Sequence, residues 1–335
     1  MLSQAVVDAT EVRYRDRATE RSQTIQELRT AGGVMNANDP DLVRKRTKRV
    51  INAPSVTPIT TTELEKPKTS ANALERVILG NDLMNINYLG LGIKAARSIA
   101  RIQVRDAGGS QIGWGSGFLV SPDLLLTNHH VLEDAATAAN SRLQMPGEDD
   151  LDGNPMPVQV FNLDPQRFFV TSPIDKLDYT IVAVAPQADG TTVAAYGFNR
   201  LIPATGKLVK GEFVTIIQFP NGGQKQIALR QNEVVDIFDD FIHYFTDTAQ
   251  GSSGAPVMND QWEVVALHHS GVPKKRNDGK WVNIDGGIWK ESEGEERVDW
   301  IANEGVRISA LVADLKKRPL KGDKLALRKA VTGGA

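Results

Sequence analysis

The chain has 335 residues, more than one typical domain needs and too few for three, and its 41% hydrophobic content allows a sizeable core. The formal net charge of −2 at pH 7 gives no overall attraction to nucleic acid or to an anionic membrane. There is no cysteine, which excludes disulfides, metal–thiolate sites and thiol catalysis and fits a reducing compartment.

The first residues show neither the basic start nor the apolar stretch of a signal peptide. No run of about 20 apolar residues follows that would cross a bilayer. We therefore expect a soluble, cytoplasmic protein that needs no cofactor or metal and binds neither nucleic acid nor membrane.

Residues 1–75 differ in composition from the rest of the chain. Residues 10–30 are charged and favour a helix, and a second helix is expected over 40–51, with a proline in its first turn. Residues 54–70 are rich in Thr and Pro and predict a linker. With few large apolar residues, this segment is expected to be a helical arm that docks a partner or regulates the protein.

The second of these helices carries a basic run at 44–49, which would suit nucleic acid or an acidic partner. We interpret it instead as a solvated helix face. Asp39, just before the helix, is the expected N-cap.

Residues 76–318 are expected to form one catalytic domain. After short helices over 71–79 and 92–98, the apolar period becomes two and turns recur, which is typical of antiparallel β-structure. Strands are predicted over 99–104, 115–120, 124–128, 158–162, 179–184, 213–218, 225–235, 241–245, 255–258, 263–268 and 306–308. This number of strands fits two packed barrels of about six strands each.

The end of the chain is expected to be helical and then frayed. The charged, Gly-interrupted stretch 274–301 would rim a cleft or form a disordered insertion. Ser309 is the expected cap of a helix over 310–317, and residues 319–335 are expected to be a loose tail.

A turn at 248–256, Thr-Ala-Gln-Gly-Ser-Ser-Gly-Ala-Pro, holds the candidate nucleophile. The glycines on either side of Ser253 allow a sharp bend and close approach of a ligand. On such a turn the Ser253 hydroxyl points outward, and the backbone amides of Gly251 and Ser253 face one spot, as an oxyanion hole requires.

The serine needs a base and an orienting acid, and earlier segments supply both. An apolar strand at 124–128 is followed by His129 and His130, and Asp178 opens the apolar strand 179–184. Asp175, three residues earlier, is the alternative acid. A carboxylate at the start of an apolar strand needs a partner, and an imidazole provides one.

Together these segments resemble the bacterial trypsin-like serine peptidases, in the disulfide-free branch that includes the glutamyl endopeptidases. The resemblance covers about residues 98–317. It rests on four motifs in family order: Gly-Ser-Gly-Phe-Leu-Val at 115–120 with Leu-Thr-Asn-His-His-Val at 126–131, Asp-Tyr-Thr-Ile at 178–181, Gly-Ser-Ser-Gly-Ala-Pro at 251–256, and Val-Val-Ala-Leu-His-His-Ser-Gly at 264–271. It implies a chymotrypsin-like all-β fold of two antiparallel six-stranded barrels with a C-terminal helix.

The resemblance also implies roles. The family's catalytic histidine directly precedes a valine, which selects His130 over His129, and its aspartate directly precedes the apolar strand, which favours Asp178. Ser253 would be the nucleophile of a serine endopeptidase acting on protein or peptide substrates.

The specificity pocket carries two conflicting signals. Counted back from Ser253 without gaps, Asp247 falls at the position where trypsin-like enzymes carry the Asp that binds Arg or Lys. Thr248 and His268 fall at the positions where glutamyl endopeptidases carry the Thr and His that bind a carboxylate. A bare carboxylate favours a cationic side chain, and a protonated histidine favours an anionic one. We expect a basic residue before the scissile bond.

The biological role is left with three interpretations. The first is a general endopeptidase. The second is limited processing of one partner protein, as similar proteases perform in bacterial defence or regulatory systems. The third is a non-catalytic binding module that keeps the protease fold.

Overall fold

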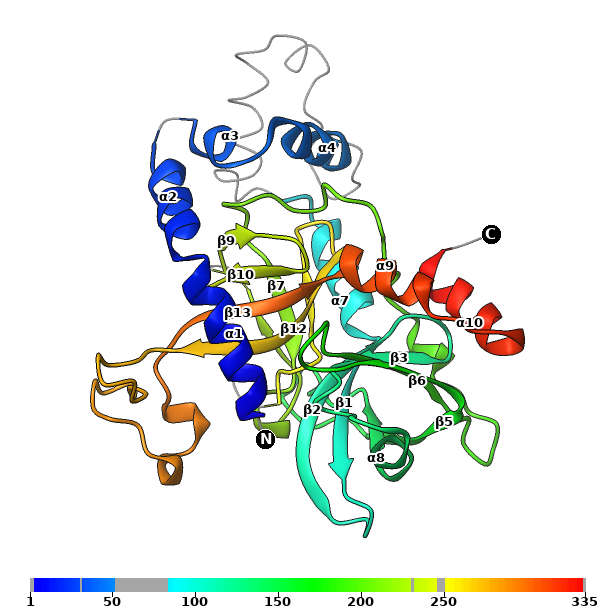
Figure 1. Ribbon diagram of the computed structural model, residues 1–335. Helices are drawn as coiled ribbons and strands as arrows, with labels where there is room; N and C mark the ends of the chain where they lie inside the picture. Colours follow the sequence, from blue (N-terminus) through cyan, green and yellow to red (C-terminus); the bar gives the residue numbers. More distant parts are fainter. Residues whose placement is uncertain (1–2, 31, 52–83, 230–231, 246–250, 334–335) are drawn as a thin grey trace.

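The computed structural model describes residues 3–30, 32–51, 84–229, 232–245 and 251–333. Two antiparallel β-structures lie beside each other and carry helices on their outside (Figure 1). The first is a closed barrel with the strand order β1-β2-β3-β6-β5-β4. Its strands are β1 (Ile99–Arg105), β2 (Gln111–Leu119), β3 (Leu124–Thr127), β4 (Arg142–Met145), β5 (Gln159–Ser172) and β6 (Tyr179–Val184).

The second structure is a seven-stranded antiparallel sheet with the order β8-β7-β11-β12-β13-β10-β9. Its strands are β7 (Thr215–Gln218), β8 (Gln226–Ala228), β9 (Val234–Ile237), β10 (Phe241–Tyr244), β11 (Pro256–Met258), β12 (Val264–Pro273) and β13 (Trp300–Arg307). The expected chymotrypsin-like fold is confirmed, with one correction. Among the described residues the second half is an open half-barrel of seven strands, and not a closed barrel of six.

The core lies inside and between these two structures because their central strands are buried on both faces. Every residue of β3, β6 and β12 is buried. One apolar cluster joins both halves, with Phe118 and Tyr179 from the barrel, Phe219 and Leu267 from the other half, and Leu311 from the C-terminal helix. This shared core holds the two β-structures in a fixed relation, so the turns at their junction are well placed to form a site.

Several short helices cover the β-structures: α7 (Asn87–Ala96), α8 (Ala135–Asn140), α9 (Ile308–Lys317), α10 (Gly322–Thr332), and the 3₁₀ turns η2 (Val193–Tyr196), η3 (Pro220–Gly222), η4 (Glu291–Glu293) and η5 (Glu295–Arg297). Two expectations are wrong here. The tail is not frayed, because α10 buries Val331 in the shared core. Ser309 is not a cap, because α9 already begins at Ile308.

The N-terminal residues form α1 (Gln4–Asp16), α2 (Ala18–Leu28), α3 (Gly33–Ala37) and α4 (Pro40–Ile51). In Figure 1, α1 lies across β12 and β13, and α2 continues toward β9. The inner face of α1 buries Val6, Val7 and Thr10, so this helix is attached to the second sheet. The predicted linker 54–70, the predicted helix 71–79 and the expected domain boundary at 75 lie outside the described residues.

The start of α4 follows the sequence prediction, but its basic run does not. Asp39 caps the helix, because its Oδ1 accepts from the amides of Asp41 at 2.9 Å and Leu42 at 3.1 Å. Arg46 is only 1% exposed and its Nε lies 2.7 Å from Oε1 of Glu212. The run is therefore not simply a solvated face.

Residues 274–299 form an ordered extension between β12 and β13. Isolated β-bridges join its turns, and Trp281 stacks on Trp289 with ring centres 5.0 Å apart. The alternative of a disordered insertion is therefore wrong. Strand β4 is an element that the sequence reading did not predict.

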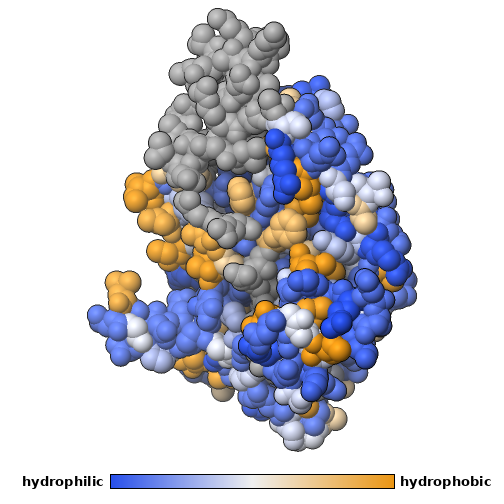
Figure 2. All heavy atoms as spheres, turned by 90° about the vertical axis from the view of Figure 1, so that its left-hand side faces the viewer, coloured by the Kyte–Doolittle hydropathy of each residue, from blue (hydrophilic) through white to orange (hydrophobic). Residues whose placement is uncertain are grey.

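The face on the α1 side of the molecule is mostly hydrophilic, with separate apolar patches (Figure 2). Across the described ranges, none of the helices is both long and apolar enough to span a bilayer.

Candidate active site

The turn after β3 and the turn before β6 bring His130 and Asp178 together. These strands are paired, so their ends meet at the junction of the two β-structures. His130 Nδ1 lies 2.7 Å from Asp178 Oδ2, and the His130 amide donates to Asp178 Oδ1 at 3.0 Å. Asn128 donates through Nδ2 to the Asp178 carbonyl at 2.8 Å, which supports the positive φ of 41° at Asp178. Asp175, the alternative acid, is exposed.

Asp178 is fully buried and stays ionised because donors surround it. Burial alone would raise the pKa of its carboxyl, but His130 and His269 hold that pKa well below its usual range. The His269 Nδ1 lies 3.0 Å from Asp178 Oδ2. Sequence reasoning placed residue 269 only within a strand lining the pocket and missed this contact.

The turn carrying Ser253 is fixed against the first barrel. The Ser116 amide donates to the Ser253 carbonyl at 2.8 Å, and Ser116 Oγ donates to the Gly251 carbonyl at 2.7 Å. A Cβ on Gly254, which has φ 88°, would lie 2.0 Å from the Ser116 carbonyl oxygen. This close approach explains both the glycine at 254 and the position of the turn.

Ser253 and His130 line one cleft of about 280 Å³. Trp114, Ile112 and Glu133 of the first barrel form further parts of its wall, and Gly251 also faces it. Ser3, which directly precedes α1, lines the same cleft. The start of the N-terminal arm therefore lies at the site.

His129 and His268, the other two candidate histidines, have other contacts. His129 Nδ1 lies 2.7 Å from Thr171 Oγ1. His268 is buried, with Nδ1 2.7 Å from the Tyr244 hydroxyl. Burial, together with the neighbouring His269 and His130, lowers the pKa of His268 to about 3, so this ring is neutral at pH 7. Asp247 and Thr248 lie outside the described residues.

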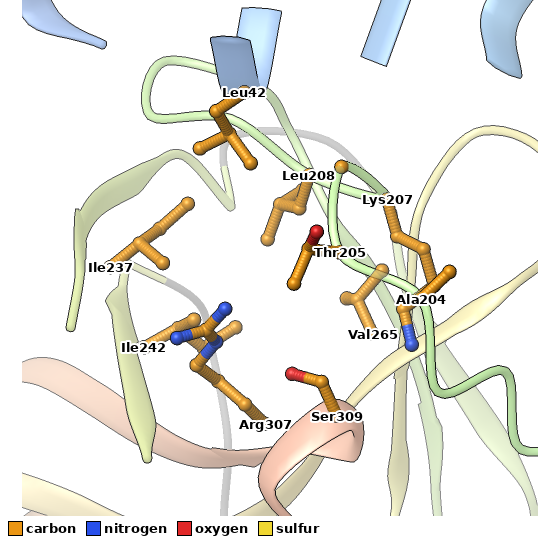
Figure 3. A pocket seen from close by; sticks show the side chains of 11 residues that line it. Leu42, Ala204, Thr205, Lys207, Leu208, Ile237, Ile242, Val265, Arg307 and Ser309 are labelled. Carbon is orange, nitrogen blue, oxygen red and sulfur yellow. The ribbon is translucent and has the colours of Figure 1, made fainter. Parts of the chain in front are cut away.

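A second, smaller hollow of about 30 Å³ shares no lining residue with the first (Figure 3). Leu42 of α4 closes it from one side, and Leu208, Ile242 and Val265 form its apolar wall. A volume of this size holds about one water molecule and no peptide. Within the described ranges, no cluster of three or more His, Asp or Glu side chains has a geometry suited to a metal.

A closed barrel beside a half-barrel, with a His–Asp pair and a serine in one cleft at their junction, defines the class of trypsin-like serine peptidases. Residues 115–267 match the protein-family model described as "Trypsin-like peptidase domain".

The chain is similar to several individual proteins. The chain is 43% identical over 263 residues to "Uncharacterized protein y4fB" of Sinorhizobium fredii, a match that covers 74% of this chain and 40% of that protein. It is 25% identical over 192 residues to the glutamyl endopeptidase of Staphylococcus aureus strain MW2, with coverages of 55% and 54%. The chain thus spans about half or less of these relatives. Among solved structures, the active form of the Rv3671c protease from M. tuberculosis gives a TM-score of 0.42 at 17% identity, covering 71% of this chain and 88% of that one.

Proposed function

We propose that the chain is a serine endopeptidase with Ser253, His130 and Asp178 as its catalytic triad. The observation that carries the proposal is the buried His130–Asp178 pair, joined at 2.7 Å, in a cleft that Ser253 also lines. Ser253 Oγ attacks the peptide carbonyl and gives its proton to His130 Nε2. The proton then passes to the leaving amine, and water hydrolyses the acyl-enzyme by the same route in reverse.

Asp178 has two tasks in this mechanism. Its Oδ2 accepts from Nδ1 of His130, which fixes the neutral ring in the tautomer with a free Nε2 lone pair. Its negative charge stabilises the imidazolium that forms during proton transfer. The amides of Gly251 and Ser253 are the proposed oxyanion donors, which the fixed turn on Ser116 keeps preorganised.

For specificity we propose a basic residue before the scissile bond, bound by Asp247. The alternative, an acidic residue bound through Thr248 and His268, is weakened by the lowered pKa of His268, because a neutral ring offers no cation to a carboxylate. A peptide library with each residue type before the scissile bond tests this. Cleavage after Glu or Asp would refute the basic preference.

A narrower role is also part of the proposal: limited processing of one partner protein in a bacterial defence or regulatory system, in the cytoplasm. Its support is indirect. Ser3 of the N-terminal arm lines the cleft, so the arm can influence which substrates reach it. The arm also offers a surface for a regulatory partner, and the absence of cysteine suits a reducing compartment.

The experiment that separates an enzyme from a binding module uses two adjacent serines. Ser253→Ala should lose cleavage of a denatured protein substrate by about a million-fold, to background. Ser252→Ala, whose residue is fully buried beside it, should keep most of the activity. Equal, measurable activity of Ser253→Ala and the wild type would show that Ser253 is not the nucleophile, whereas an inactive but folded wild type would favour the binding module.

A further inference from the structure

A line of buried side chains continues from Asp178 away from the cleft. His269 on β12 contacts Asp178 through Nδ1 at 3.0 Å and Glu304 on β13 through Nε2 at 2.7 Å. Both carboxylates are completely buried, and the His269 ring is buried with them. Asp178 is therefore contacted by two imidazole rings, His130 from the cleft side and His269 from the interior.

The far end of this line is held by the N-terminal helix. Arg13 on α1 donates through Nε to both carboxylate oxygens of Glu304, at 2.9 and 3.0 Å. Thr10, one turn earlier on α1, donates its hydroxyl to Glu304 Oε1 at 3.1 Å. On the sheet, His243 Nε2 lies 2.9 Å from Glu304 Oε2. Two of the residues that hold Glu304 thus come from the N-terminal arm, 291 and 294 positions away in the sequence.

The charges along this line alternate. Burial alone would lower the pKa of His269, but the hydrogen bonds to Asp178 and Glu304 raise it. A protonated His269 donates from both ring nitrogens, and its bond to Asp178 therefore fixes the orientation of that carboxylate. Glu304 in turn is a buried anion and needs the guanidinium of Arg13, because an uncompensated buried carboxylate is strongly unfavourable.

Aromatic packing reinforces the same contact. The Arg13 guanidinium carbon lies 4.1 Å from the centre of the Phe241 ring, and Phe241 stacks on His269 with ring centres 5.7 Å apart. Arg13 therefore supports both the partner of His269 and the ring that covers it.

We propose that Arg13, Glu304 and His269 are positioning residues for Asp178, so that helix α1 is an integral part of the catalytic apparatus. This inference rests on the proposed triad. It differs from the expectation that the N-terminal segment is only an accessory arm. The contact between helix α1 and the β-structures should then affect kcat directly, because Asp178 must hold His130 in place while the proton moves.

The test compares two arginine–glutamate pairs with buried carboxylates that attach N-terminal helices to the second sheet and its flanking turns. Arg46 on α4 donates through Nε to both oxygens of Glu212, at 2.7 and 3.0 Å, as Arg13 does to Glu304. Arg13→Met and Arg46→Met therefore each remove the arginine partner of a buried glutamate. Of the two pairs, only Arg13–Glu304 connects to Asp178, through His269.

In the whole 335-residue chain, Arg13→Met should lower kcat by about 10- to 100-fold, the range typical of losing a second partner behind a functional side chain, with KM within about threefold. Arg46→Met should keep kcat within about threefold at a temperature where both variants are folded. Arg13→Lys retains the cation and should recover part of the kcat. Equal kcat values for Arg13→Met and Arg46→Met, or no recovery with lysine, would overturn the inference.

Glu304→Gln gives a second readout if Arg13→Met folds poorly. It keeps the size of the side chain and removes its charge, and kcat should again fall without a matching rise in KM. A kcat equal to that of the wild type would overturn the inference. Failure of the proposed function looks different, because then the folded wild type itself would not hydrolyse peptides.

Discussion

At the scale of single residues, Asp178 is the group on which the site depends. It is completely buried, yet it accepts from the amide and Nδ1 of His130 and from Nδ1 of His269. Donors on both oxygens compensate the loss of hydration, so the carboxylate remains charged in the interior. The same donors fix its orientation toward His130.

The two adjacent histidines provide the first prediction. His130 contacts Asp178, whereas His129 contacts Thr171 Oγ1. His130→Ala should therefore be inactive, and His129→Ala should retain at least about a tenth of the wild-type kcat/KM.

Steady-state kinetics of the two variants measure both effects. An inactive His129→Ala variant together with an active His130→Ala variant would show that the base is His129 and not His130.

At the scale of elements, the turn around Ser253 is positioned by the first barrel. Gly254 has φ 88°, and an added Cβ would approach Ser116 O at 2.0 Å and Thr127 Oγ1 at 2.4 Å. Gly279, with φ 81°, is a matched control because an added Cβ there meets nothing within 4 Å.

Gly279→Ala should lose about 1–2 kcal/mol, the usual cost of a left-handed alanine, and remain active. Gly254→Ala should lose more than about 4 kcal/mol or displace the turn and abolish activity. Chemical denaturation and peptide hydrolysis of both variants measure this. Similar stability and activity of the two variants would show that close packing on Ser116 does not position the turn.

Elements with a strong local pattern could be predicted from the sequence. The alternation and apolar runs of 99–104 and 179–184 correspond to β1 and β6, and the two ends of the His–Asp pair were located by the strands that carry them. Strand β4 was missed because four residues with two polar side chains give too little periodic signal. The tail was expected to fray because its charges conceal the apolar side of α10 that packs on the core.

The interior part of the site could not be predicted for a different reason. Arg13 and Glu304 are 291 positions apart, and neither belongs to a local motif. The sequence around a charged residue in a polar helix, or around a polar residue in a strand, does not identify the residue's partner until the fold is known. His269 carried a partial signal, since a histidine that continues a strand after the apolar run 264–267 needs a partner if it is buried.

At the scale of the whole molecule, arginines connect the N-terminal helices to the second sheet and its flanking turns. Arg13, Arg17, Arg46 and Arg49 pair with Glu304, Asp236, Glu212 and Glu263, respectively. Such pairs specify where the helices attach more than they add net stability. The helices are therefore expected to fold together with the β-structures.

The buried charges predict how stability depends on pH. Glu304 and Asp178 have pKa values lowered by their hydrogen-bond partners, despite burial, so their contribution is present above the unfolded pKa of about 4 and is lost as pH falls. His269 has a raised pKa, so its contribution is present below the unfolded pKa of about 6.5 and is lost as pH rises through the folded value. For these three groups together, stability is expected to be greatest at weakly acidic pH.

Melting temperatures between pH 3 and 9 test this, with Glu304→Gln as the comparison. The variant should melt lower at pH 6 and show a flatter profile, because it lacks the titrating carboxyl and no longer supports the charge on His269. Parallel profiles for the two proteins would mean that Glu304 does not contribute to the pH dependence.

The most direct measurement for the central claim is the site of covalent labelling by a fluorophosphonate, located by mass spectrometry of the digested protein. A working triad predicts one adduct, on Ser253, that forms in the wild type and is absent in His130→Ala under the same conditions. The absence of an adduct in folded wild-type protein, an adduct on another residue, or equal labelling without His130 would contradict the account.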